Sequence, residues 1–418
     1  MADTPRLQGR DIVCVGFADW DTDLQTNQHH LMKRLALENR VLFVESLGLR
    51  RPQLAGRDVR RILRRVVRGL GGARTVDGIG LPGMAGDGLG EARTRSGLNV
   101  LSPLVLPLHG NPLARRVNSW LLPKLVRRAA RTLDMERPIL WSYVPQAEVL
   151  LDALEPELVI YHCVDDIAAQ PGIDGSSFRA SEARFAARAD LVLASAPSLA
   201  ARLGDISDNV LYVPNVADVE LFSSALRDGP VDLGMADLPR PRIVFTGALV
   251  RTKLDMGLLF VLARARRDWS FALVGPTGPG DPRADMSGLA SEPNIYLLGP
   301  RPYEALPEVL RGADAGLIPY SLNQLTASIF PMKVYEYLAA GLPVVATALP
   351  ALAGVEMVAT AADAHGMVGL LEQAMAEDSD ELRAARSRAA QAHSWELRIG
   401  EIATAIDRLS PEPTKVLG

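Results

Sequence analysis

The sequence has few cysteines and no excess of one charge, so it lacks the features that identify disulfide-rich, zinc-binding and nucleic-acid-binding proteins. Its 418 residues include only two cysteines, Cys14 and Cys163, which stand far apart inside apolar runs. Such a pair predicts neither a disulfide framework nor a zinc site, and both residues are expected to be small buried side chains. An excess of one charge is also missing, because 45 Lys and Arg oppose 49 Asp and Glu, for a formal net charge of −4. This balance gives no broad electrostatic case for nucleic acid as a partner.

Long apolar stretches are missing as well. The first ten residues, MADTPRLQGR, are polar and lack the apolar core of a signal peptide, and no later run is long enough to span a bilayer. The expected compartment is therefore the cytoplasm. What the chain does contain is 48% apolar and 22% charged residues, the proportions of a folded protein. Its length predicts about two domains.

Short β-branched runs alternate with longer segments of helical period. The strand-like runs include DIVCVGF, RVLFVES, LVIYHCV and DLVLAS in the first half, and RIVFTGAL, SFALVGP, NIYLLGP and LPVVAT after Pro239. This alternation is typical of βαβ units, so the predicted fold class is α/β with two doubly wound parallel sheets. The Gly-, Pro- and Asp-rich stretch RDGPVDLGMADLPRPR indicates a linker, and we place the domain boundary near residue 235. A cleft between the facing strand ends is the expected ligand site.

Residues 50–95 depart from the alternation. A basic stretch at 50–68 precedes a Gly-rich tract, which together predict an amphipathic helix followed by a mobile loop. Two interpretations are open: a solvated surface helix with a variable insertion, or a patch for anionic lipid or an acidic substrate. We favour the solvated helix, because Pro52 and Gly56 interrupt its start and only moderate hydrophobicity lies opposite the arginines.

The densest motif is FPMKVYEYLAAGLPVVAT at 330–347. Pro331 suits the first position of a helix and Gly341 its C-terminal cap, so a helix over 331–340 and then a buried strand are predicted. The free N–H groups at the start of this helix, with Lys333 in its first turn, are suited to a diphosphate. The carboxylate of Glu336 can accept hydrogen bonds from a ribose diol. A plain surface ion pair between Lys333 and Glu336 is the alternative, which the strand-loop-helix context disfavours.

This motif resembles the nucleotide-sugar motif of GT-B glycosyltransferases. The resemblance is to their large retaining group, which is similar to glycosyltransferase family 4 and is called glycosyl transferases group 1. Flanking segments agree with the resemblance: TGALVRTK, SFALVGP, NIYLLGPRPYEALPEVLRGADAGLIPY, VPNVADVELF and SWELR. Together they extend it over nearly the whole chain. It implies an acceptor-binding domain over 1–235, a nucleotide-sugar-binding domain over 236–393 and a C-terminal helix over 394–418 that packs back on the N-terminal domain.

The resemblance also implies roles for residues of the C-terminal domain. Lys253 and Lys333 would neutralise the diphosphate, Glu336 would bind the ribose, and the segment from Arg301 to Tyr303 would contact the base. The full implied donor set is Gly247, Lys253, Gly275, Arg301, Tyr303, Thr326, Ser328, Lys333 and Glu336. The donor is a substrate, so no cofactor is implied. No metal is implied either, because lysines replace it and no Asp-x-Asp motif stands in a suitable place.

The sequence departs from the family pattern at two positions, and these departures leave the identity of the transferred sugar open. Ala248 follows the loop glycine where the family often has Arg. Ser328 stands eight positions before Glu336, where a second carboxylate is usual, so the backbone amides of the loop 326–330 are expected to help Lys333.

In the N-terminal half, polar residues follow two predicted strands. His162 matches a His that related enzymes place near the transferred sugar, and a structural hydrogen-bonding role is its alternative. The loop after the first strand supplies candidates for the acceptor site, although helix capping by Thr26 or Asn27 explains part of its composition. These candidates are Asp19, Trp20, Gln28 and His29.

The sequence therefore predicts a retaining glycosyltransferase that moves a sugar from UDP or GDP to an acceptor. Its catalytic candidates are His162, Lys253 and Lys333, which would act by electrostatics and positioning rather than as nucleophiles. A soluble metabolite or natural-product intermediate is the preferred acceptor, and contact with a membrane surface is not favoured. Two alternatives are open: an acceptor that is a lipid-linked cell-surface polysaccharide, and a catalytically inactive GT-B-like partner subunit.

Overall fold

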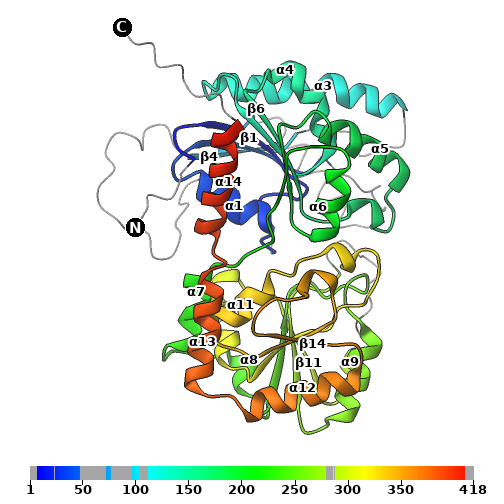
Figure 1. Cartoon of the computed structure of the whole chain (residues 1–418), viewed down its shortest axis with the longest axis vertical. Helices are drawn as coiled ribbons and strands as arrows, with labels where there is room; N and C mark the ends of the chain where they lie inside the picture. Colours follow the sequence, from blue (N-terminus) through cyan, green and yellow to red (C-terminus); the bar gives the residue numbers. More distant parts are fainter. Residues whose placement is uncertain are drawn as a thin grey trace. The chain divides into compact units, whose positions relative to one another are not determined.

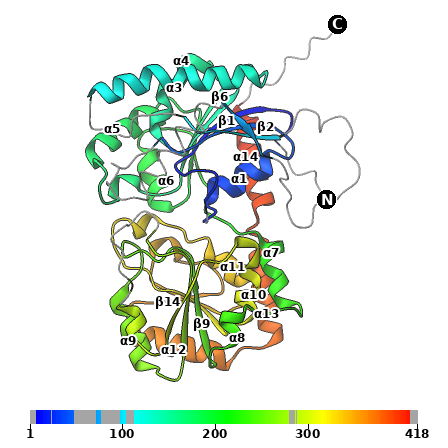
Figure 2. The same cartoon turned by 180° about the vertical axis from the view of Figure 1, so that it is seen from behind.

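The computed structural model describes residues 7–22, 24–47, 72–76, 97–103, 112–278, 286 and 288–409. The basic stretch predicted at 50–68 lies outside the described residues, as does most of the Gly-rich tract that follows it. The contacts divide the chain into two compact units: Met1–Val213 with Ile399–Gly418, and Pro214–Arg398. Figures 1 and 2 draw the chain from opposite sides, with the C-terminal helix in red.

The N-terminal unit is built on a sheet of eight strands in the order β3-β4-β2-β1-β5-β6-β7-β8. All neighbours pair in parallel except β3 and β4. The strands are β1 Asp11–Val15, β2 Arg40–Val44, β3 Arg74–Thr75, β4 Gly97–Leu101, β5 Ile139–Ser142, β6 Leu158–Cys163, β7 Leu191–Ala194 and β8 Val210–Tyr212. Every residue of β5, β6 and β7 is buried, as expected for strands covered on both faces.

Helices cover this sheet by burying their apolar sides. On one face, Leu122 and Val126 of α3 and Phe185 of α5 join Val13 and Leu140 in a single apolar cluster. The helices of the unit are α1 Asn27–Leu35, α3 Pro112–Thr132, α4 Leu151–Leu154, α5 Gly175–Ala186, α6 Pro197–Gly204 and the greater part of α14 Trp395–Leu409. None of the described helices is long and apolar enough to cross a membrane.

The C-terminal unit is built on six parallel strands in the order β11-β10-β9-β12-β13-β14. The strands are β9 Arg242–Thr246, β10 Ser270–Val274, β11 Ile295–Gly299, β12 Ala315–Ile318, β13 Val344–Thr347 and β14 Val358–Ala361. The helices are α7 Val219–Ser223, α8 Leu233–Ala236, α9 Met256–Ala265, α10 Leu306–Arg311, α11 Lys333–Ala339, α12 Ala364–Ala376 and α13 Asp380–Gln391. After β9 the chain builds one side of the sheet, and from β12 it builds the other. The strand order therefore switches between β9 and β12, the position where α/β sheets bind ligands.

The predicted α/β class with two doubly wound units is confirmed. The contacts place the boundary between the units at Val213 and Pro214, earlier than residue 235. Helix α7 lies before the Gly- and Pro-rich stretch, packs against α10, α11 and α13, and buries Phe222 fully. The stretch itself is not a free linker, because it contains the helix α8. Met235 of α8 is also fully buried.

The C-terminal helix α14 changes unit along its length. It begins at Trp395, and from Ile399 onward it belongs to the N-terminal unit, where Figures 1 and 2 draw it beside α1. Ile402 and Ile406 are buried there. The helix expected over 394–418 stays a prediction in its full extent, because residues 410–418 lie outside the described part. Both cysteines are buried and neither forms a disulfide, as predicted.

A buried charge cluster stabilises the N-terminal unit. The Glu182 carboxylate, whose residue is 2% exposed, accepts hydrogen bonds from Arg202 Nη1 at 2.6 Å, Tyr161 Oη at 2.8 Å and Arg179 Nη1 at 3.1 Å. Burial by itself raises the pKa of Glu182, but the hydrogen bonds and charge of Arg202 outweigh burial and lower the pKa below its ordinary value. The cluster joins β6, α5 and α6.

We predict that Glu182→Gln lowers the free energy of unfolding by about 3 kcal/mol, because the variant removes the carboxylate that pairs with Arg202 and leaves Arg179 with Asp166 alone. Glu148→Gln is the matched control, since Glu148 lies 3.5 Å from Arg184 and 3.9 Å from Arg188 in pairs exposed to solvent. The control should lose less than about 1 kcal/mol. Urea unfolding measures both, and equal losses in the two variants would contradict the assignment.

Candidate functional site

The candidate donor site lies at the switch between β9 and β12. Gly247 follows β9 with φ +128°, and Gly275 follows the neighbouring β10 with φ +154°. A Cβ atom on Gly275 would lie 1.9 Å from the carbonyl oxygen of Gly247, a distance that no side chain tolerates. The two loops therefore meet backbone to backbone, and only glycine fits at Gly275.

Lys333 lies over this junction. Its Cε and Nζ atoms would both be 3.5 Å from a Cβ on Gly247. The Nζ atom donates to Tyr320 Oη at 2.9 Å and lies 5.1 Å from the ring centroids of both Phe245 and Tyr320. Aromatic faces favour a cation at this distance. Three predicted donor residues, Gly247, Gly275 and Lys333, are thus together in the structure.

Tyr337 fixes the helix that carries Lys333. Its hydroxyl accepts a hydrogen bond from the Thr246 amide at 2.7 Å, and its side chain is fully buried. This contact ties α11 to the end of β9, beside Gly247. Helix α11 begins at Lys333, two residues later than the predicted start, because Pro331 and Met332 form a turn before the regular helix. It ends as predicted, with Gly341 in the left-handed region at φ +77°.

Glu336 is a buried carboxyl group on the same helix. Only 7% of the residue is exposed, and burial raises its pKa from 4.5 to about 7. The Lys333 charge opposes that rise, the Asp218 carboxylate adds to it, and a hydrogen bond from the Tyr303 hydroxyl opposes it. The structure therefore places Tyr303, expected at the base, against Glu336, expected at the ribose. Tyr303 also packs edge-on against Phe222, with ring centroids 5.4 Å apart.

Lys253 lies in the loop that follows Gly247. Its carbonyl oxygen accepts a hydrogen bond from the Ser321 amide at 2.8 Å, and Leu254 pairs with Tyr320 across an isolated bridge. The Lys253 backbone therefore adjoins the segment whose Tyr320 hydroxyl binds Lys333. Its side chain is half-buried.

Thr326 and Ser328 have local structural partners. The amides of residues 326–329 donate within the loop or to Asn323 and Leu325, and the Thr326 hydroxyl bonds the Ser321 carbonyl. Any use of these amides for a diphosphate requires that these hydrogen bonds be replaced, so their predicted role stays a prediction.

Arg301 is held by an ion pair that the sequence did not reveal. Its Nε atom donates to Asp232 at 2.6 Å, its Nη2 atom donates to the same carboxylate at 3.1 Å, and Nη1 donates to the Leu298 carbonyl at 2.7 Å. Asp232 in turn caps α8. Arg301 thus links α8 to the loop after β11, and its predicted contact with a base stays a prediction.

The N-terminal unit has its own switch point, between β1 and β5. His162, near the end of β6, is 2% exposed and stacks on Tyr143 with ring centroids 4.8 Å apart. Its Nδ1 atom accepts a hydrogen bond from the indole of Trp141 at 3.4 Å, which leaves the ring proton on Nε2. The Tyr143 hydroxyl donates to Asn27 at 2.9 Å, so this aromatic group connects β5 and β6 to the start of α1.

The four predicted acceptor residues lie in the loop between β1 and α1 and in the first turn of α1. His29 Nδ1 accepts from the Thr26 amide at 3.1 Å, so its Nε2–H donates to the Asp19 carbonyl at 3.0 Å. Burial lowers the pKa of His29 to about 4, against the opposing hydrogen bond to Asp19. Gln28 is fully buried and its Oε1 accepts from the Phe17 amide at 2.9 Å, while Trp20 packs against His29. Of the four, only Asp19 is not buried, and acceptor contact stays a prediction for the set.

Sequence reasoning missed Glu45, a buried carboxylate at the end of β2. It accepts hydrogen bonds from the Trp20 amide at 2.9 Å and from Ser102 Oγ at 2.5 Å. A charged residue directly after the buried run RVLFV was the available signal. Tyr320 and Tyr337 were also missed, because their sequence context does not distinguish them from core aromatics.

Comparisons with known proteins bear on the C-terminal unit and on the fold. Residues 240–385 match the family model of glycosyl transferases group 1. The putative teichuronic acid biosynthesis glycosyltransferase TuaH of Bacillus subtilis is 30% identical over 245 residues, which cover 55% of this chain and 60% of that protein. The match thus spans less than two thirds of that relative.

Within the described residues, no three His, Cys, Asp or Glu side chains cluster as metal ligands would.

Solved structures match nearly the whole chain. HepE of Anabaena in complex with UDP has a TM-score of 0.59 and 14% identity, covering 95% of this chain and 100% of its own. Sucrose-phosphate synthase from Thermosynechococcus elongatus has a TM-score of 0.64 and 16% identity, covering 96% and 99%. The predicted GT-B fold is thereby confirmed, and the resemblance to glycosyl transferases group 1 is confirmed by the family model within the C-terminal unit.

The raised pKa of Glu336 makes stability depend on pH. Its proton stabilises the folded state fully below about pH 4.5, and this contribution is lost as the pH rises through about 7. We predict that wild type loses about 2 to 3 kcal/mol between about pH 5 and pH 8 relative to Glu336→Gln, which has no proton to release. Urea unfolding of both proteins at the two pH values measures the difference. Parallel pH profiles would show that Glu336 titrates normally.

Proposed function

We propose that the protein is a retaining glycosyltransferase that moves a sugar from a nucleotide-diphosphate sugar, with UDP or GDP, to an acceptor. The observation that carries this proposal is the convergence of Gly247, Gly275 and Lys333 inside the segment that matches the family model. HepE structures with UDP and with UDP-glucose, which share the fold, support a UDP-sugar as the first donor to test.

The donor diphosphate is assigned to the two lysines. The Lys333 ammonium lies beside two glycine loops whose lack of side chains allows a phosphate to approach the backbone. Tyr320 and Phe245 hold that ammonium in place before the ligand arrives, so little reorganisation is needed. Lys253 supplies the second positive charge from the adjoining loop. The stabilised diphosphate is then a good leaving group.

Glu336 is assigned to the ribose of the donor. A carboxyl group offers both of its oxygens as full acceptors to a diol when it is ionised, because protonation turns one of them into an O–H donor. Its pKa of about 7 means that nucleotide binding draws Glu336 into its ionised form and releases its proton near neutral pH. The segment from Arg301 to Tyr303 is assigned to the base, and the Tyr303 hydroxyl lies next to Glu336.

Transfer then needs positioning rather than a protein nucleophile. The departing phosphate oxygen takes the proton from the acceptor hydroxyl as the new glycosidic bond forms on the same face of the sugar. His162 is assigned to orient the sugar rather than to act as a base. No divalent metal has a role in this scheme.

The acceptor has two candidates. A soluble metabolite or natural-product intermediate is the first, because Pro52 and Gly56 interrupt the basic stretch at 50–68 and only moderate hydrophobicity lies opposite its arginines. A lipid-linked cell-surface polysaccharide is the second, and the relative named for teichuronic acid biosynthesis favours it. A catalytically inactive partner subunit is disfavoured, since such a subunit has no use for a lysine held over two glycine loops.

Lys333→Met tests the donor assignment, because it keeps the apolar stem and removes the charge. We predict that affinity for UDP-glucose falls about 10- to 100-fold, the equivalent of about 1.5 to 3 kcal/mol for one charge-assisted hydrogen bond. Arg267→Met, at an exposed arginine of the same unit, is the control and should bind as wild type does. Calorimetric titration measures the affinities, with GDP-mannose as the second donor. Unchanged binding in Lys333→Met would exclude its role at the diphosphate.

The stereochemical outcome tests the reaction itself. We predict that the transferred sugar keeps the anomeric configuration of the donor, because the leaving phosphate, and not a side-chain base on the opposite face, takes the acceptor proton. The anomeric coupling constant of the product in a proton NMR spectrum distinguishes the two outcomes. Inversion would require a general base, and would make the passive role of His162 wrong.

A further inference from the structure

Helix α3 of the N-terminal unit presents a mixed apolar and basic face to solvent. In its first half Leu113 is 74% exposed, Val117 is 44% exposed and Trp120 is 62% exposed. Lys124, Arg127 and Arg131 continue the same line at helical spacing and are also exposed. The opposite side of the helix, including Leu122 and Val126, is buried in the core. The exposed line is therefore a second, outward-facing stripe, and we call it the α3 stripe.

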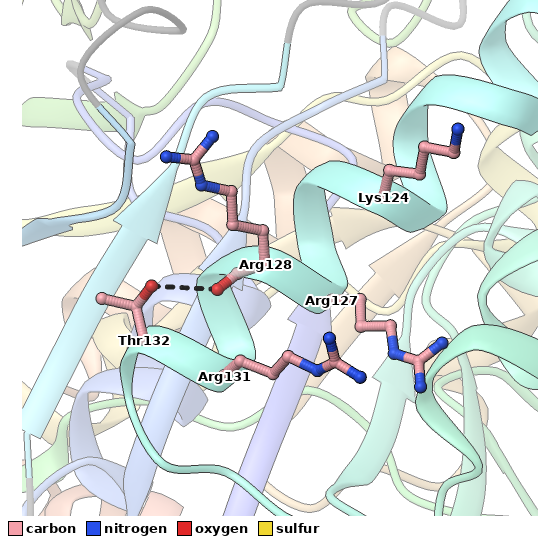
Figure 3. A pocket seen from close by; sticks show the side chains of 5 residues that line it. All are labelled: Lys124, Arg127, Arg128, Arg131 and Thr132. Carbon is pink, nitrogen blue, oxygen red and sulfur yellow. Dashed lines mark hydrogen bonds between the residues drawn. The ribbon is translucent and has the colours of Figure 1, made fainter.

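The charge of α3 is of one sign. The helix contains no Asp or Glu among its 21 residues, whereas the whole chain has more acidic than basic residues. Its basic residues are Arg115, Arg116, Lys124, Arg127, Arg128 and Arg131. Lys124, Arg127, Arg128, Arg131 and Thr132 line an open hollow of about 410 Å³, and Figure 3 shows their side chains along the helix. Such a stripe attracts a polyanionic surface.

Trp120 joins the apolar and basic parts of the stripe. The ammonium of Lys124 lies 3.6 Å above its ring, so the indole carries a cation on one face. The other four tryptophans of the chain, at positions 20, 141, 269 and 395, are at most 8% exposed. Exposing one indole among arginines is unfavourable in water and favourable at an interface that is apolar below and charged above.

We propose that the α3 stripe docks on the surface of a bilayer that contains anionic lipid. The helix is about 30 Å long and lies along the surface of the unit, which suits contact in the plane of a membrane. The basic half of the stripe pairs with lipid phosphates, and Val117 and Trp120 enter the boundary between headgroups and acyl chains. Nucleic acid would satisfy the arginines alone and leaves the exposed apolar half unexplained. The proposal is independent of the donor site, which lies in the other unit.

Vesicle binding by the full chain tests the proposal. Vesicles of equal parts phosphatidylcholine and phosphatidylglycerol should sediment the protein at low salt, and vesicles of phosphatidylcholine alone should not. Because Trp120 is the exposed tryptophan, its emission should shift to shorter wavelength on binding and be quenched by brominated lipid. Removal of each cation should weaken partitioning about fivefold. The triple variant Arg127→Gln, Arg128→Gln, Arg131→Gln should therefore lose about 100-fold, and the binding of wild type should fall with added salt.

The matched control is Arg267→Gln, Arg388→Gln, Arg408→Gln, which changes the net charge equally at three exposed arginines away from α3. It should bind vesicles as wild type does. Trp120→Ala should weaken binding and abolish the fluorescence shift, with an unchanged thermal unfolding curve. Equal binding by both triple variants would overturn the proposal, even if the protein sediments with vesicles through another segment. Binding to a labelled DNA duplex without binding to vesicles would also overturn it, in favour of nucleic acid.

Discussion

The candidate donor site depends on the contact between two backbone segments, where the carbonyl of Gly247 occupies the space that a side chain on Gly275 would need. This contact sets the distance between the loops that follow β9 and β10. Because glycine leaves both loops without side chains at this contact, the side chain of Lys333 can lie against them. Tyr320 and Phe245 hold it in place. Glycine is required at position 275 by this contact, and the positive φ of Gly247 favours glycine there as well.

The second constraint is the position of α11 relative to β9. The hydroxyl of Tyr337 binds the amide of Thr246, the last residue of the strand, so the helix cannot slide along the sheet without breaking a buried hydrogen bond. Lys333 and Glu336 lie on the same helix and are therefore positioned together. The N-terminal unit uses aromatic rings for the same purpose, since His162 stacks on Tyr143, whose hydroxyl binds Asn27.

The sequence predicted the two sheets and the helix that carries Lys333, because these depend on local patterns of buried runs and helix ends. The positions of Gly247, Gly275 and Lys253 came from the family resemblance. The sequence did not predict partners that are distant along the chain. The ion pair of Arg301 with Asp232 joins a loop to a helix that the composition suggested was a linker. Met235 is fully buried within that stretch, so the short helix α8 forms where Gly and Pro indicated none. Pairing of this kind is tertiary, and neither periodicity nor propensity encodes it.

Glu336 shows why the site residues differ from the surrounding core in their effect on stability. A buried carboxyl group with a pKa near 7 destabilises the folded protein once it ionises, and an apolar residue in its place would not. The adjacent Lys333 reduces that penalty without removing it. A side chain that is unfavourable for folding but chemically suited to a ribose diol is typical of a binding site, where function restrains the choice of residue more than stability does. By the same reasoning the exposed indole of Trp120 is unfavourable for the isolated chain, so both residues point to a ligand or surface that is needed to satisfy them.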